Sequence, residues 1–495
     1  MKVDQINWGD DSAEHDASLM NYFVRSTAFT RLTNKSKGVV VGRKGSGKSA
    51  LRKALEQHFS DHQDTHLISI SPSFNHIKNV LNANMTGFSE EIFFQHTWLR
   101  QIMLDCLCKI GHSAKGHYAT ESLEFARKVS VELNKTSKDF VENITDILSS
   151  VKAKAGSLGD FGLDLEKELR NIAEVDSLSF HLKALAQGGA KFVILIDDLD
   201  LGWNNSDVSN NLLLGLLAAT ASLKALSPEN IYSCVFLRED VYSILIRKTQ
   251  HSDKYRNIEP IRWDKKTLVD LLNARINHNR HLQLLDRKLD PFFDVFPETV
   301  GTSYTANWLI ERTLERPREL IQLARYYTEQ ISGQADAEIL KGSEQVYSNW
   351  KLDDLCTEYS NQYPGLIVIF QYWKTKFFRG KYHLKRTDIE EKILEIICNV
   401  ALNEKWFNEI TNELDVQLLL KIFYEVGFIG DFVQGGAGGS KTFYSFKDVH
   451  EPIFEEVQIH PCFRKAVNTV VRNSSNNNSA VPLSSTDNAI DEPAA

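Results

Sequence analysis

The sequence predicts an α/β fold with a mostly parallel sheet, and three observations support this prediction. Residues 37–73 follow the order apolar strand (GVVV), glycine loop, amphipathic helix and second strand (HLISIS). The unbroken apolar run that begins KFVILI at residue 191 is typical of a strand covered on both faces. A helix expected from about Ser206 to Leu226, followed by the apolar run IYSCVFL, continues the alternation of helix and strand.

Length and composition limit the class of protein. The chain has 495 residues, which suggests about three domains at roughly 100 to 200 residues each. Its 57 Lys and Arg against 65 Asp and Glu give a net charge of -8, so the chain is no polycation, and any nucleic-acid contact must be a local patch. The first residues lack the apolar core of a signal peptide, and the longest uncharged stretch, 208–223, falls short of a membrane span. The six scattered cysteines fit a reducing compartment, so we expect a cytoplasmic protein with no membrane contact.

The chain is expected to have five parts. Phe140, Ile144, Ile147, Leu148 and Val151 repeat on one helical face, which predicts a helical insertion in the sheet. A helix there should start at Ser89, and Gly111 should stop a helix. The parts are 1–36, a segment packed on the core; 37–265, the core, with its insertion at about 85–188; 266–340, a helical lid after the strands stop; 341–472, mostly helical; and 473–495, a disordered tail.

The fourth part has the order of a winged helix. In DVQLLLKIFYEVGFIGDFVQGGAGGSKTFYSF a helix precedes two short strand-like runs. The turn that joins these runs contains Gly435, Gly436, Gly438 and Gly439. We therefore expect a winged-helix-like domain at the end of the folded chain.

The segment from Gly42 to Ser49 matches a phosphate-binding loop. GRKGSGKS satisfies G-x-x-x-x-G-K-S/T at every constrained position. The glycines let main-chain N–H groups approach phosphate oxygens, and the helix that opens at Lys48 adds its positive N-terminus. Lys48 is placed for the β and γ phosphates, as a catalytic residue, and Ser49 for Mg²⁺. The nucleotide-binding candidates are Gly42, Arg43, Lys44, Gly45, Ser46, Gly47, Lys48, Ser49 and Ala50.

A run of aspartates ends the buried strand in KFVILIDDLD. Charges at the carboxyl ends of parallel strands lie at the rim where ligands bind. We expect Asp197 to hold Mg²⁺ and Asp198 to polarise the attacking water. Asp200 is a weaker candidate for either role. The alternative for Asp198 and Asp200 is an acidic loop that caps the next helix.

These motifs resemble those of P-loop ATPases of the AAA+ and STAND grouping. The resemblance rests on the glycine loop, LIDDLD, FLRED and RPREL, and it covers most of residues 15–470. LMNYFVRSTAFTRL and IHPCF are also similar to segments of bacterial ATPases encoded in antiviral defence loci. The resemblance implies a three-layer P-loop NTPase domain with ATP and Mg²⁺ as cofactors. It also implies a sensor arginine, Arg238, with a catalytic role, and a lid arginine at Arg318 or Arg316.

The chain departs from the AAA+ pattern at Asp198, where a glutamate is usual, and this leaves the rate of hydrolysis open. Arg256 and Arg247 are candidates for reaching a neighbouring subunit's γ phosphate, with ordinary surface arginines as the alternative. A salt bridge to Glu239 or Asp240 is the alternative for Arg238.

A basic, aromatic segment near residue 380 makes DNA or RNA a candidate partner. Residues 374–386 contain no acid. The basic side chains of this segment could neutralise phosphates, and its aromatic rings could stack on bases. The alternative is a solvated helix end whose aromatic rings face the core. The basic residues are Lys374, Lys376, Arg379, Lys381, Lys385 and Arg386, and the aromatic ones are Trp373, Phe377, Phe378 and Tyr382.

Other combinations of ligand-type residues are weak. Cys106 and Cys108, with His112 and His117 nearby, match none of the usual zinc spacings, so buried thiols on a helix are the simpler interpretation. His278, His281 and His460 are better interpreted as structural histidines.

Three functions follow from these patterns. The first is slow, Mg²⁺-dependent ATP hydrolysis used as a conformational switch over a protein effector, with homo-oligomers forming on ATP binding and with a role in bacterial antiviral defence. The second is nucleotide-dependent binding of DNA or RNA with little turnover. The third is a scaffold in which bound nucleotide only adds stability.

Overall fold

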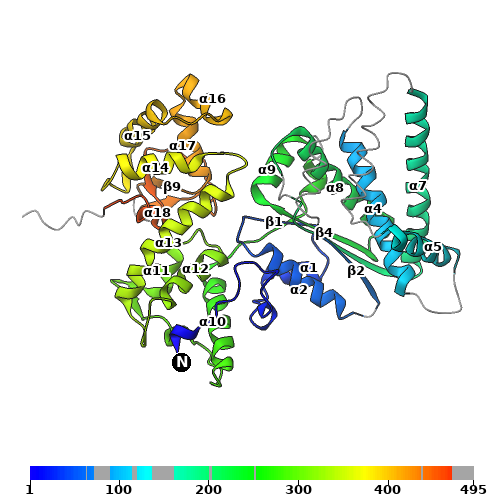
Figure 1. The fold of residues 1–495 in the computed structure, drawn as a ribbon, viewed down its shortest axis with the longest axis horizontal. Helices are drawn as coiled ribbons and strands as arrows, with labels where there is room; N and C mark the ends of the chain where they lie inside the picture. The colour runs from blue at the N-terminus through cyan, green and yellow to red at the C-terminus, as the bar shows by residue number, and fades with distance from the viewer. Residues whose placement is uncertain are drawn as a thin grey trace, which may run out of the picture. The chain divides into compact units, whose positions relative to one another are not determined.

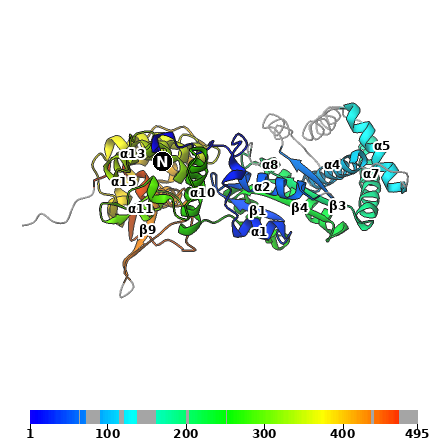
Figure 2. The same ribbon diagram turned by 90° about the horizontal axis from the view of Figure 1, so that it is seen from below.

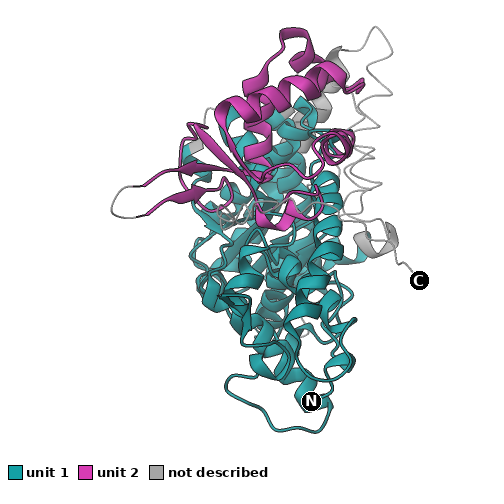
Figure 3. Ribbon diagram, turned by 90° about the vertical axis from the view of Figure 1, so that its left-hand side faces the viewer, with its two compact units in different colours: residues 1–366 teal, residues 367–495 magenta. Residues whose placement is uncertain are grey.

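The computed structural model describes residues 1–62, 64–71, 90–113, 120–136, 161–199, 203–249, 252–435 and 439–470. The chain divides into two compact units, Met1–Leu366 (unit 1) and Ile367–Ala495 (unit 2), coloured teal and magenta in Figure 3. No helix within those ranges has both the length and the apolar content needed to cross a membrane. The expected tail at 473–495 and the helical repeat from Phe140 to Val151 lie outside the described residues.

A five-stranded parallel sheet is the centre of unit 1 (Figure 1). Its strands, in order across the sheet, are β2 (Thr65–Ile70), β3 (Lys191–Ile196), β4 (Ile231–Arg238), β1 (Val39–Gly42) and β5 (Ile258–Pro260). β1 pairs with β4 from Val39↔Val235 to Gly42↔Arg238, and β4 also pairs with β3. The carboxyl ends of β1, β3 and β4 therefore meet at one edge of the sheet, as predicted from the alternating sequence.

Successive strand residues enter two separate cores, which is why the strands are apolar throughout. On one face, Val40, Leu195 and Phe236 pack with α1 (Thr27–Thr33) and α2 (Lys48–Ser60). On the other face, residues such as Val41 and Ile196 pack with α8 (Asp207–Leu226) and α9 (Glu239–Lys248). In Figure 1, α1 and α2 lie on one side of the sheet and α8 on the other. This is the predicted three-layer arrangement.

A helical insertion separates β2 from β3, as predicted. Its described helices are α4 (Glu90–Ser113), α5 (Glu121–Thr136) and α7 (Phe161–Gln187). α4 packs on α8, where Trp98 Nε1 donates to the carbonyl of Leu212 at 3.0 Å. The prediction that Gly111 stops a helix is wrong, because α4 continues to Ser113. A β-carbon at Gly111 would lie 2.3 Å from the carbonyl oxygen of Ala126, so this glycine allows α5 to approach closely.

The helical lid of unit 1 follows β5. Its helices are α10 (Lys265–Leu282), α11 (Thr305–Glu311), α12 (Pro317–Thr328) and α13 (Ala337–Glu358). Asp264 and Thr267 form a capping box that starts α10. Strands do not stop completely after the core, because β6 (Thr299–Val300) and β7 (Ser303–Tyr304) form a small hairpin. The expected boundary at residues 340/341 falls inside α13, whereas the two units divide after residue 366.

Unit 2 is mostly helical and winged-helix-like, as predicted. An antiparallel sheet in the order β10 (Lys441–Phe443), β9 (Ile429–Val433), β11 (Glu456–Ile459), β8 (His383–Lys385) packs with its helices. The wing is the hairpin of β9 and β10, which extends from the body of the unit in Figure 2, and residues 436–438 at its tip lie outside the described residues. The elements are α14 (Leu366–Lys376), β8 (His383–Lys385), α15 (Arg386–Asn399), α16 (Lys405–Glu413), α17 (Val416–Glu425), β9 (Ile429–Val433), β10 (Lys441–Phe443), β11 (Glu456–Ile459) and α18 (Pro461–Arg464).

Candidate functional site

The glycine loop turns the chain from β1 into α2. Gly45 and Gly47 have φ of +76° and +93°, in the left-handed region that a β-carbon would strain. Gly47 is the N-cap residue of α2 and has no side chain that could accept a hydrogen bond from the amides of the first turn. Lys48 begins α2, and its Nζ donates to the carbonyl of Gly42 at 3.0 Å. The loop thus places the positive end of a helix and an ammonium group at the carboxyl end of β1.

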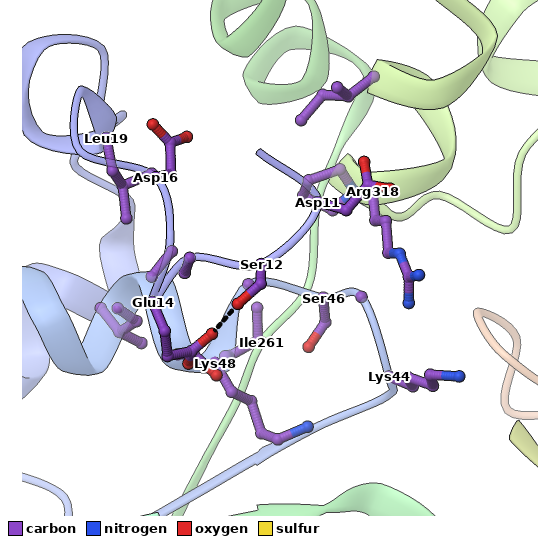
Figure 4. Close-up of a pocket in the computed structure, with 18 of the residues that line it drawn as sticks. Asp11, Ser12, Glu14, Asp16, Leu19, Lys44, Ser46, Lys48, Ile261 and Arg318 are labelled. Carbon is purple, nitrogen blue, oxygen red and sulfur yellow. Dashed lines mark hydrogen bonds between the residues drawn. The ribbon is translucent and has the colours of Figure 1, made fainter. Parts of the chain in front are cut away.

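A cavity of about 500 Å³ lies over this loop. Its lining comes from the loop, from the N-terminal segment (residues 1–26) and from the lid, and Figure 4 shows Lys44, Ser46 and Lys48 on one side of it. Every predicted loop residue from Lys44 to Ala50 lines the cavity. Gly42 and Arg43 do not, and Arg43 instead donates to the hydroxyl of Tyr359 at 3.1 Å.

The hydroxyl of Ser46 is a buried polar group that borders the cavity. Ser46 is buried and lines the cavity, yet its Oγ has no hydrogen-bond partner among the described residues. Gly42 makes room for this hydroxyl, because a β-carbon there would lie 2.4 Å from Ser46 Oγ. A buried polar atom without a partner is costly, so a hydrogen-bonding ligand in the cavity would relieve this cost.

Asp197 and Asp198 both line the cavity from the end of β3. Asp197 is 2% exposed, and Arg52 Nε lies 3.3 Å from its Oδ2. Burial, followed by the charge of Asp198, raises the pKa of Asp197 to about 7, even though Lys48 and Arg52 act in the opposite direction. A bound cation would stabilise such a carboxylate. Asp198 has a left-handed backbone, with φ of +64°, and accepts a hydrogen bond from the hydroxyl of Ser71.

Arg238, the predicted sensor arginine, both lines the cavity and forms a salt bridge with Asp240. These are the two alternatives that the sequence left open. Arg238 lines the cavity, and its Nη2 lies 2.6 Å from Oδ2 of Asp240. The same group donates to the carbonyl of Glu358 at 3.3 Å. Arg247 and Arg256 are exposed, and Asp200 lies outside the described residues.

The two lid arginines differ in their surroundings. Arg318 lines the cavity from the start of α12 and packs closely on the loop, because a β-carbon at Gly45 would lie 3.1 Å from Cβ of Arg318. Arg316 is buried and does not line the cavity; its Nη1 donates to the carbonyl of Lys44 at 2.9 Å. Of the two candidates, Arg318 is therefore the one in position to meet a ligand.

A buried ion network supports the glycine loop from the lid. Arg316 Nη1 lies 2.7 Å from Glu358 Oε2. Lys351, whose side chain is fully buried, lies 2.9 Å from Glu319 and 3.1 Å from Asp354. Burial alone would raise the pKa of Glu358, but Arg316 and other nearby cations lower it to about 2. The network therefore fixes α13 to α12 with charged groups that have partners.

Sequence reasoning missed the N-terminal segment as part of the site. Figure 4 shows Asp11, Ser12, Glu14 and Asp16 around the cavity. The only signal was the acidic run DDSAEHD at 10–16, which no phosphate motif includes.

Apolar residues line another part of the cavity, and Trp263 links them to the loop by donating to the carbonyl of Ser46 at 2.8 Å. Such a lining suits a flat aromatic ligand group. The other apolar residues include Leu19, Phe23, Ile261, Leu271 and Ile321.

The basic segment of unit 2 has buried aromatic rings, and two of its basic residues, Lys376 and Arg386, pair with acids of the same unit. Trp373 and Phe377 are 1% and 8% exposed, so the alternative in which the aromatics face the core is confirmed for these two rings. Phe378 is exposed. Lys376 Nζ lies 2.9 Å from Glu395 Oε1. The exposed basic residues of the segment are Lys376, Arg379, Lys381 and Lys385.

Among the described residues, no group of three or more His, Cys, Asp or Glu side chains is placed to hold a metal ion by itself. Cys106 is buried in α4, and His117 lies outside the described ranges. His460 caps α18 by accepting from the amide of Cys462, in agreement with a structural role.

Comparisons with known proteins give one family match and several likenesses. Residues 266–356 match a FunZ-associated C-terminal helical domain, which covers α10 to most of α13. An 80.3 kDa protein of transposon gamma-delta from Escherichia coli K12 is 26% identical over 93% of this chain and 67% of its own length. Two solved structures are similar: the Aeropyrum pernix ORC1 protein in complex with DNA (11% identity, 90% and 91% coverage, TM-score 0.37) and the ORC2 protein of that organism (10%, 92% and 91%, 0.32). At these TM-scores the two structures say nothing about the activity of this chain.

Proposed function

We propose that this chain binds ATP with Mg²⁺ and hydrolyses it slowly, as a conformational switch that controls a partner. The observation that carries the proposal is a single cavity lined by Lys48, Ser49 and the buried Asp197, which follow the carboxyl ends of β1 and β3 on either side of β4 in the parallel sheet. The unpartnered hydroxyl of Ser46 in the same cavity supports an anionic, hydrogen-bonding ligand.

The lining of the cavity fits the parts of a nucleotide. The phosphates would lie on the glycine loop and the N-terminus of α2, with Lys48 beside them and Arg318 and Arg238 on the lid and strand sides. The base would enter the apolar part beside Trp263.

Two residues suit Mg²⁺. The hydroxyl of Ser49 and the carboxylate of Asp197 are hard oxygen ligands. Burial and the charge of Asp198 raise the pKa of Asp197, and a bound cation would stabilise the charged form of this carboxylate. When bound, Mg²⁺ would supply positive charge to the phosphate oxygens. Asp198 would orient the attacking water. We infer slow turnover because Asp198 is shorter than the usual glutamate and is engaged by Ser71.

The switch would act through the lid. Arg316 donates to the carbonyl of Lys44, and Asp354 on α13 lies 3.4 Å from Lys44 Nζ, so a loop that moves with its ligand would shift α12 and α13. A protein effector, a role in antiviral defence, a cytoplasmic location and assembly of subunits on ATP binding remain predictions. Mass measurement with and without ATP would test the last of these.

Phosphate release under steady-state conditions tests the proposed function. Lys48→Ala and Asp198→Asn should each reduce turnover by about 10²-fold or more. Lys191→Ala is the matched control, because Lys191 is exposed at the opposite, amino end of β3. Unchanged turnover in both site variants would reject ATP hydrolysis at this cavity.

A second candidate is nucleotide-dependent binding of DNA or RNA. The β9–β10 wing and the exposed Arg379 and Lys381 favour it, and the matching relative is named for a transposon. Filter binding at two salt concentrations, with Lys374, Lys376, Arg379 and Lys381 reversed in charge, decides the matter. An unaffected affinity would remove this surface as a nucleic-acid site.

A further inference from the structure

Two peptide units of the glycine loop are of a kind that can reverse direction. Gly45 and Gly47 have φ of +76° and +93°. Turn types I and II differ by reversal of the one peptide that precedes such a residue, and glycine tolerates either sign of φ. The reversible peptides are therefore Lys44–Gly45 and Ser46–Gly47. A trans peptide directs its carbonyl and its N–H in opposite directions, so a contact that holds the carbonyl also orients the amide of the following glycine.

Side chains from the part of unit 1 that follows β5 hold both of these carbonyls. Trp263 Nε1 donates to the carbonyl of Ser46 at 2.8 Å. Arg316 Nη1 donates to the carbonyl of Lys44 at 2.9 Å. The indole of Trp263 also lies against the second glycine, because a β-carbon at Gly47 would be 3.8 Å from its Cζ2 atom. Each reversible peptide of the loop thus has one donor that fixes its direction.

The sheet sets the position of Trp263. The amide of Ile261 donates to the carbonyl of Val41 at 2.8 Å, which continues the pairing of β5 with β1 as far as the glycine loop. Trp263 comes shortly after Ile261 and directly before Asp264, whose capping box starts α10. The main chain is therefore fixed on both sides of Trp263, and the scaffold itself places the indole beside the loop.

The amides of Gly45 and Gly47 are the groups that this arrangement orients. Both glycines line the cavity, and neither amide donates to an acceptor among the described residues. Such amides suit phosphate oxygens, whereas a reversed peptide would present a carbonyl oxygen, which repels an anion. We propose that Trp263 is a positioning residue for phosphate, which holds the Ser46–Gly47 peptide in the direction that leaves the Gly47 amide to the ligand. Arg316 acts in the same way on the amide of Gly45.

This inference rests on the proposed nucleotide site and deepens it. It gives the indole a role in binding phosphate, separate from its place in the apolar part of the cavity. Trp263 is also the better residue for a test, because Arg316 is buried in the ion network and its loss would lower stability. Trp263→Phe keeps an aromatic ring but removes the Nε1 donor, and Trp263→Leu removes both.

Calorimetric titration with inorganic tripolyphosphate and with ATP, each with Mg²⁺, measures the two roles separately. Trp263→Phe should weaken the binding of both ligands by the same factor, about tenfold, because one hydrogen bond to the loop is lost. Trp263→Leu should weaken tripolyphosphate binding by that factor and ATP binding by more, because the base also loses the ring.

Trp98→Phe is the matched control. Its Nε1 also donates to a carbonyl, that of Leu212, at 3.0 Å, but neither residue lines the cavity. The dissociation constants of this variant for both ligands should equal those of wild type, even where its melting temperature is lower.

The outcomes separate this inference from the proposed function. Wild type that binds neither ligand rejects the proposed function itself, and the role of Trp263 with it. Wild type that binds ATP but no tripolyphosphate overturns only the positioning role, because the loop would then not be a preformed phosphate site. Trp263→Phe with a wild-type dissociation constant for tripolyphosphate also overturns it: the indole would then act through the base if ATP binding alone is weakened, and as a structural group if only the melting temperature falls.

Discussion

Two segments of this chain have sequences that predict phosphate binding, and their surroundings in the fold differ. In unit 1, the glycine loop borders a cavity in which the Ser46 hydroxyl has no partner among the described residues and the Asp197 carboxylate is buried. In unit 2, Trp373 of the basic segment packs among core rings, and Lys376 pairs with Glu395. Positive charge and aromatic rings therefore indicate a binding site only where the fold leaves polar groups to be satisfied by a ligand.

The largest expected effect concerns Trp373 and tests the unit 2 side of this comparison. Trp373→Ala should lower the free energy of unfolding by about 4 kcal/mol, because it removes a ring that packs against Phe377, Phe423 and Phe428. Denaturant unfolding measures the change. Phe378→Ala, at a 61% exposed neighbour, is the control and should change stability by less than about 0.5 kcal/mol. Equal stability of the two variants would mean that Trp373 is not a core residue.

The charges next to the cavity in unit 1 are not all available to a ligand, and Glu358 tests this distinction. Glu358→Gln should destabilise the chain by about 3 kcal/mol, because it leaves Arg316 buried with a weakened partner. Glu338→Gln on the same helix is the matched control, since its pair with Lys341 is largely exposed and should contribute less than about 1 kcal/mol. A melting temperature equal to that of wild type for Glu358→Gln would contradict the structural role of the network.

The same carboxylate predicts an acid dependence of stability. The folded pKa of Glu358 is about 2, below its ordinary 4.5, so its contribution is fully present above about pH 4.5 and is lost as the pH falls towards 2. A difference of about 2.5 pH units corresponds to about 3 kcal/mol. Urea unfolding between pH 7 and pH 3 should therefore show the gap between wild type and Glu358→Gln closing with acid. A gap that widens would have the wrong sign.

Asp197 is the contrasting carboxylate, because burial raises its pKa instead of a partner lowering it. Asp197→Asn should weaken Mg²⁺-dependent nucleotide binding by about thirtyfold, or about 2 kcal/mol, without lowering the melting temperature. Calorimetric titration with and without Mg²⁺, together with thermal unfolding, measures both quantities. A lower melting temperature with unchanged binding would make Asp197 a structural residue like Glu358.

The sequence predicted those features that depend on neighbours along the chain. Lys48 was predicted at the start of a helix from the local order of strand, glycine loop and helix. Asp197 was predicted at the end of an apolar strand, and the two residues were expected at the same edge because the strands of the sheet are parallel. The sequence did not indicate that Glu14 lines the cavity, because its position depends on a tertiary contact with Arg52 of α2. It offered Arg316 as a lid arginine but not as a buried support of the glycine loop, because that role depends on its contact with Lys44. Gly111 was misinterpreted for a similar reason: its small size serves the approach of α5 rather than the end of α4.

The smallest expected effect concerns the exposed charges of the unit 2 segment. If unit 2 contacts nucleic acid, these charges act through counterion release and not through stacking on Trp373, which is buried. Arg379→Glu with Lys381→Glu should weaken affinity by less than about tenfold at fixed salt and reduce the slope of log affinity against log salt by about 2. The control reverses Lys405 and Lys421, which are exposed on α16 and α17. A loss well above tenfold without a change of slope would indicate specific contacts by this segment, and the comparison between the two units would then no longer hold.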